Sequence, residues 1–182
     1  MPIQFEKLSV LVVEDIQPMR KLIRTVLEAM GVGRIYTAPN GEEAFKLFCQ
    51  VNPDIVISDW EMEPQNGIDL TEIIRRDPNS PNHMVPVIII TGYSALERVK
   101  IARDTGVTEF LIKPFTARDI AHRISSVINK PRDFIDAQES YFGPDRRRRS
   151  NSQYDGPLRR EDEKQKNAAN NNTDDVFEIK ML

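Results

Sequence analysis

Apolar and polar positions along the first 130 residues fall into blocks of two kinds. Short blocks rich in Val and Ile are typical of buried strands, whereas longer blocks with apolar residues three or four positions apart predict amphipathic helices. The expected strands cover residues 7–15, 34–38, 54–59, 85–91 and 107–113. The expected helices cover residues 17–31, 40–50, 67–76, 94–106 and 116–130.

Each expected strand is followed by an expected helix, and three of the strands are apolar runs rather than alternations. Strands that are apolar on both faces are typical of parallel sheets whose two faces are covered. Right-handed crossovers place the connecting helices on both sides of such a sheet. The pattern therefore predicts an α/β fold, a doubly wound five-stranded parallel sheet with helices on both faces. Ligands of such sheets bind at the carboxyl ends of the strands.

The composition divides the chain into a domain, residues 1–130, and a tail, residues 131–182. Apolar residues are sparse over most of the tail, too few to offset the entropy of ordering, so we expect most of it to be disordered. The tail contains a Gly-Pro-Arg repeat, in which "YFGPDRR" at 141–147 returns as "YDGPLRR" at 154–160. This repeat and the terminal "VFEIKML" at 176–182 are candidate motifs for a tail-binding partner, although a solvated linker is the simpler interpretation.

Charge and motif content exclude several classes of function. The net charge of −3 gives no global attraction to nucleic acid, and the tail is too short and polar for a folded DNA-binding module. No apolar run is long enough to span a membrane and no signal peptide is seen, so we expect a cytoplasmic protein. No phosphate-binding G-x-x-x-x-G-K-[ST] loop is present. We expect the single cysteine, Cys49, to be a buried structural thiol.

Polar residues that carry chemistry stand where four of the expected strands end: Glu14 and Asp15, Asp59, Thr91, and Lys113. Clustered carboxylates raise one another's pKa, and a Mg²⁺ ion or the lysine would relieve this repulsion. A carboxylate can also act as a nucleophile toward phosphorus, in a transfer that needs mainly positioning and neutralisation of charge. The residue set therefore predicts phosphoryl transfer to an aspartate.

The order "ED" at 14–15, "D" at 59, "T" at 91 and "KP" at 113–114 resembles the receiver domain of two-component response regulators, of the single-domain chemotaxis type. The resemblance covers roughly residues 6–130 and implies a flavodoxin-like sheet with strand order 2-1-3-4-5. It implies that Asp59 is the phosphoacceptor. It further implies that Glu14, Asp15, Asp59 and the backbone carbonyl of Glu61 hold Mg²⁺, and that Thr91 and Lys113 bind the phosphoryl group.

The resemblance assigns the remaining roles as well. Phe110 corresponds to a switch aromatic, Glu61 and Tyr93 are expected to tune dephosphorylation, and the bond before Pro114 is expected to be cis. One departure is the loop "DWEMEPQNG", where Glu63 takes a position usually held by proline.

The expected function is a phosphorylation-controlled signalling module rather than an enzyme, with Mg²⁺-dependent autophosphorylation and autodephosphorylation. The expected donor is a histidine kinase or a phosphotransfer protein, and the expected output is protein–protein interaction. The downstream target would meet the face formed by the helix at 94–106, the strand at 107–113 and the helix at 116–130. One alternative is a scaffold or adaptor that acts without phosphorylation. Another is a phosphatase with an aspartate nucleophile, for which Glu61 would replace the usual second aspartate.

Overall fold

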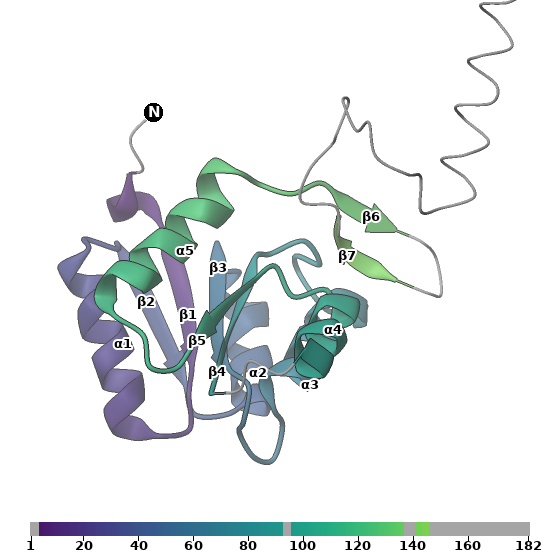
Figure 1. Ribbon diagram of the computed structural model, residues 1–182, viewed down its shortest axis with the longest axis horizontal. Helices are drawn as coiled ribbons and strands as arrows, with labels where there is room; N and C mark the ends of the chain where they lie inside the picture. The colour runs from purple at the N-terminus through teal and green to yellow at the C-terminus, as the bar shows by residue number, and fades with distance from the viewer. Residues whose placement is uncertain (1–3, 93–95, 137–140, 146–182) are drawn as a thin grey trace, which may run out of the picture. The chain divides into compact units, whose positions relative to one another are not determined.

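A parallel sheet with strand order β2-β1-β3-β4-β5 forms the centre of the domain (Figure 1). The computed structural model describes residues 4–92, 96–136 and 141–145. The strands are β1 Ser9–Val13, β2 Arg34–Ala38, β3 Ile55–Asp59, β4 Val87–Thr91 and β5 Glu109–Ile112. The helices are the 3-10 helix η1 Phe5–Lys7, then α1 Gln17–Ala29, α2 Gly41–Val51, α3 Gly67–Arg76, α4 Leu96–Thr105 and α5 Ala117–Asn129. The predicted fold class and strand order are confirmed.

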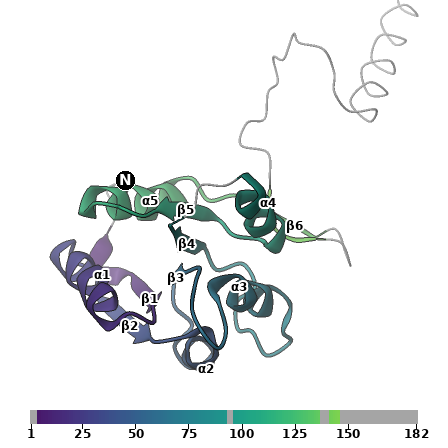
Figure 2. The same cartoon turned by 60° about the horizontal axis from the view of Figure 1, so that its bottom comes forward.

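Helices cover both faces of the sheet (Figures 1 and 2). On one face, α2, α3 and α4 contribute Ala44, Phe48, Leu70, Ile74 and Ala102 to one buried apolar cluster. On the other face, α1 and α5 contribute Ile23, Leu27, Ile120, Ile124 and Val127 to a second cluster. Every residue of the three central strands β1, β3 and β4 is buried, which explains why their sequences are apolar runs.

Local signals set the helix ends close to their predicted positions. Asn66 begins α3 by accepting hydrogen bonds from the amides of Ile68 and Asp69 at 2.8 and 3.0 Å. The carboxylate of Asp69 accepts in return from the Asn66 amide, which completes a capping box. Gly31, at φ +82°, follows the end of α1 in the left-handed region that glycine tolerates.

A short antiparallel hairpin extends the ordered structure beyond the predicted boundary at residue 130. Its strands are β6 Phe134–Asp136 and β7 Phe142–Pro144, and β7 lies against α3 and α4. The tyrosine before β7, Tyr141, is buried and donates its hydroxyl to the Pro144 carbonyl at 2.7 Å. The sequence pattern does not separate residues 134–136 and 141–145 from the tail, because so short a hairpin has no distinct sequence period.

Arg75, near the end of α3, contacts both this hairpin and the rest of the domain. Its guanidinium donates to the Gly106 carbonyl at 3.1 and 3.0 Å and to the His83 carbonyl at 2.7 Å. The same group lies 5.1 Å from the ring centroid of Phe134. Burial lowers the pKa of Arg75, but the two carbonyls and the aromatic face compensate its charge.

The cysteine of α2 lies elsewhere than the sequence predicts. The prediction that Cys49 is buried is wrong: it lies on the solvent side of α2, and its thiol contacts the Asn79 carbonyl oxygen at 3.7 Å. The predictions about Tyr93, the second repeat copy and the terminal segment concern residues outside the described part of the chain.

None of the helices in the described part is long and apolar enough to cross a membrane.

Candidate phosphoacceptor and metal site

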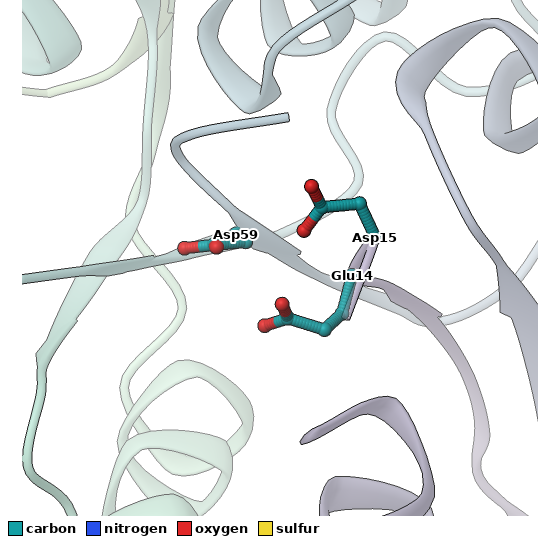
Figure 3. Close-up of side chains that lie close together, drawn as sticks. All are labelled: Glu14, Asp15 and Asp59. Atoms are coloured by element: carbon teal, nitrogen blue, oxygen red, sulfur yellow. The ribbon is translucent and has the colours of Figure 1, made fainter. Parts of the chain in front are cut away.

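Three carboxylates gather where β1 and β3 end (Figure 3). The register pairs Val13 of β1 with Ser58 of β3, so the next residues, Glu14 and Asp59, are neighbours at the sheet edge. Asp15 follows Glu14 in the loop to α1. One carboxylate oxygen from each of the three acids lies within 4.8 Å of the others. Because β1 lies between β2 and β3, this edge is also where the strand order reverses, the usual ligand position in such sheets.

Lys113, directly after β5, places its ammonium between two of these acids. Its Nζ lies 2.9 Å from Asp59 Oδ2 and 3.5 Å from Glu14 Oε2. Its amide donates to the Thr91 carbonyl at 2.8 Å, which continues the β4–β5 ladder to the lysine. The Lys113–Pro114 bond is cis, as the resemblance implied.

Asp59 is held in a fixed orientation with 4% of its surface exposed. Its Oδ1 accepts from the amide of Trp60 at 2.9 Å, while Oδ2 faces Lys113. The start of α3 packs directly behind it: a Cβ on Gly67 would lie 2.1 Å from the Asp59 carbonyl oxygen. Only glycine allows this close approach, and the Gly67 amide donates to the Trp60 carbonyl at 3.1 Å, so the loop of residues 60–66 returns to the end of β3.

The electrostatics of the site are those of a cluster with surplus negative charge. Burial and then the charge of Asp59 raise the pKa of Glu14 to about 7, although Lys113 opposes the shift. Burial works against the ammonium of Lys113, but the hydrogen bond and charge of Asp59, together with Glu14, outweigh it and raise the pKa of Lys113.

The donor set fits a hard divalent cation. Glu14 Oε2 is buried and accepts no hydrogen bond from the described part of the chain, so it has coordination capacity to spare. Asp15, in contrast, is exposed and gives access from solvent. Mg²⁺ prefers oxygen ligands, commonly takes one or two carboxylates and keeps several waters, which this half-open cluster would allow.

The structure places the other predicted site residues around this cluster. Thr91 is buried at the end of β4, and Phe110 on β5 is half-buried. Phe110 pairs with Ile89 and packs against the same cluster as Ile89, so Thr91, two residues further along β4, faces the same side of the sheet. Glu61 is exposed, in the loop that follows Asp59.

Two contacts at this edge have no signal in the sequence. The guanidinium of Arg98, on α4, forms an ion pair with Glu61 and lies over the ring of Trp60. Arg20, on α1, donates a hydrogen bond to the Glu14 carbonyl. Both contacts join an arginine side chain to a residue outside its own helix, which periodicity and motif spacing do not reveal.

Comparisons with known proteins agree with this fold. The family model of the response regulator receiver domain matches residues 10–125. The chemotaxis protein CheY-3 of Vibrio cholerae serotype O1 is 28% identical over 125 residues, covering 69% of this chain and 95% of that protein. The chemotaxis protein CheY of Pseudomonas aeruginosa is 28% identical over 123 residues, covering 68% and 98%. A crystal structure of Vibrio cholerae CheY4 superposes with a TM-score of 0.62 at 24% identity, covering 66% of this chain and 98% of that one.

Response regulator receiver domains are signalling modules rather than conventional enzymes. The chain belongs to the family of response regulator receiver domains of two-component signalling.

Proposed function

We propose that this protein is a phosphorylation-controlled response regulator whose phosphoacceptor is Asp59. The observation that carries the proposal is the position of its carboxylate, buried at a strand end and 2.9 Å from the Lys113 ammonium. The phosphodonor is a histidine kinase or a phosphotransfer protein that carries phosphohistidine. A protein with this function would act in the cytoplasm.

In the transfer, a carboxylate oxygen of Asp59 attacks phosphorus, the new P–O bond forms, and the P–N bond to the donor imidazole breaks. The imidazole leaves with the electron pair and takes up a proton. The ammonium of Lys113 stays beside the phosphoryl oxygens and offsets their charge, and the Thr91 hydroxyl donates to a further oxygen. Hydrolysis of the acyl phosphate returns Asp59 to its carboxylate.

Glu14, Asp15, Asp59 and the backbone carbonyl of Glu61 would hold Mg²⁺. When bound, the ion supplies neutralisation of charge on the phosphoryl oxygens. Two observations support this assignment: the buried Glu14 oxygen accepts no hydrogen bond from the described part of the chain, and the cluster has a surplus of negative charge.

The output is a change in one surface. Movement of Thr91 toward the phosphoryl group vacates space on the face of the sheet that Phe110 shares, and the half-buried ring turns inward. The surface formed by α4, β5 and α5 then favours binding of a target protein. Glu61 and Tyr93 tune the lifetime of the phosphoryl group, and the tail is available for a partner of its own.

Intact-mass spectrometry tests the proposal after incubation with acetyl phosphate and Mg²⁺. We expect the wild type and an Asp104→Asn control, which removes an exposed acid of α4, to gain one phosphoryl group. Asp59→Asn should gain none. Equal labelling of the wild type and Asp59→Asn would contradict the assignment of Asp59 as the phosphoacceptor. No labelling of either protein would contradict the proposal and favour the scaffold that acts without phosphorylation.

A further inference from the structure

Arg98 links α4 to the loop that follows the phosphoacceptor. Its Nη1 donates to Glu61 Oε1 at 2.8 Å. Its guanidinium carbon lies 5.5 Å from the centroid of the Trp60 ring. A single side chain of α4 therefore contacts two consecutive residues of the loop, the two that directly follow Asp59.

Stability alone does not account for this contact. The side chains of Arg98 and Glu61 are 34% and 54% exposed, and ion pairs so open to water contribute little to folding. The position of the pair is more informative, because Trp60 donates its amide to the Asp59 carboxylate at 2.9 Å. Trp60 is therefore connected to the acceptor both along the backbone and through this hydrogen bond, and Glu61 is the next residue in the chain. A change in the position of either residue would alter the surroundings of the Asp59 carboxylate.

We propose that Arg98 is a positioning residue that prolongs the life of the phosphorylated state by holding Glu61 toward α4. This inference rests on the proposed function of Asp59. It adds a residue on α4 that sets the chemical stability of the acyl phosphate.

Two physical effects act in the same direction. Hydrolysis requires a water to attack phosphorus as the P–O bond to Asp59 breaks, and the water's proton must pass to an acceptor. A released Glu61 carboxylate can orient that water, whereas a carboxylate paired with Arg98 is occupied by the guanidinium and its charge is offset. A released carboxylate also repels the anionic phosphoryl group, which destabilises the acyl phosphate.

The contact also provides a means of control. Arg98 lies on α4, one of the three elements of the proposed output surface. A target that binds this surface and shifts α4 would change the Arg98–Glu61 distance and hence the rate of phosphoryl loss. Binding and lifetime would be coupled through this one side chain.

The test measures phosphoryl loss in full-length protein labelled with acetyl phosphate and Mg²⁺ and then freed of donor. We expect Arg98→Gln to lose phosphate about two- to fivefold faster than the wild type, the range that a surface ion pair supports. Arg98→Lys should retain most of the wild-type lifetime because it keeps the charge. Arg103→Gln is the matched control, since this arginine of α4 pairs with Asp104 instead.

The decisive arm repeats Arg98→Gln in a Glu61→Gln background, where there is no carboxylate to release. The acceleration should disappear there. Wild-type loss in Arg98→Gln, or the same acceleration without the Glu61 carboxylate, would overturn the proposal.

Trp60 emission from unphosphorylated protein is measured in parallel, and it should change in Arg98→Gln but not in Arg103→Gln. Unchanged emission would also overturn the proposal, because the contact with Trp60 would then be absent. Failure of the wild type to label is a different result, which would overturn the proposed function itself.

Discussion

Glu14 should make the metal-free protein less stable as the pH rises. This carboxyl is fully buried, and its pKa is raised from 4.5 to about 7. The folded protein therefore binds the proton more tightly than the unfolded chain does. The stability that protonated Glu14 contributes is fully present below about pH 4.5 and is lost as the pH rises through about 7.

The magnitude follows from the size of the pKa change. At about 1.36 kcal/mol for each tenfold change in proton affinity, ionisation of Glu14 in the folded state costs roughly 3 kcal/mol. Glu14→Gln removes this cost because an amide does not ionise. The difference in free energy of unfolding, variant minus wild type, should increase by roughly 2–3 kcal/mol between pH 5 and pH 8.

The assay is urea denaturation of both proteins in chelator-containing buffer from pH 5 to pH 8.5. Other titrating groups are common to both proteins and cancel in the difference. Glu42→Gln is the control, because its carboxylate is exposed and pairs with Lys46 on the same helix; the effect of pH seen with Glu14→Gln should not be reproduced by this substitution. Addition of Mg²⁺ at pH 8 should stabilise the wild type and have much less effect on Glu14→Gln.

A difference between Glu14→Gln and wild type that stays flat across this pH range would refute the reasoning. So would a variant that is less stable than the wild type at pH 8 without metal. Either result would mean that Glu14 is not held as an ionised carboxyl in a desolvated site.

Three further predictions concern the surroundings of the site. Arg75→Met should lower the free energy of unfolding by about 2–4 kcal/mol in urea denaturation, because the Gly106 and His83 carbonyls lose the hydrogen bonds that the guanidinium donates; no loss would show that these hydrogen bonds contribute nothing to stability. Gly67→Ala should lower the melting temperature and abolish labelling with acetyl phosphate, since its Cβ would meet the Asp59 carbonyl; a melting temperature equal to that of the wild type would contradict the close approach. Lys113→Met should bind Mg²⁺ about threefold to tenfold more tightly by isothermal titration calorimetry, because a competing cation is removed from the acids, yet label poorly; weaker Mg²⁺ binding would show that the ammonium organises the site.

The sequence determines the central sheet and the chemistry at its edge because both depend on neighbours along the chain. An apolar strand such as β3 is recognisable from its own residues, and the residue that ends it, Asp59, must lie at the carboxyl edge. The same reasoning places Thr91 and Lys113, and the capping of α3 by Asn66 is equally local. These features need no knowledge of which helix packs against which.

Contacts between distant elements were decided only by the tertiary structure. The pairing of Arg98 with Glu61 spans 37 positions, and the bonds from Arg75 to Gly106 span 31. Hydrophobic periodicity does not indicate which distant residue an arginine side chain will contact. The exposed position of Cys49 has a different cause: Ala44 and Phe48, four positions apart, mark the buried side of α2, and Cys49 lies outside it.

The sequence by itself therefore determined the parallel sheet, the order of its elements and the residues gathered at its carboxyl edge. Hydrophobic periodicity and strand ends depend on residues that are close together in the chain, so they can be recognised from the sequence alone. Only the folded chain decided that a hairpin continues past residue 130 and that Glu61 faces α4 through Arg98. Those features depend on distances between residues that the chain brings together only after the two apolar clusters have formed on the faces of the sheet.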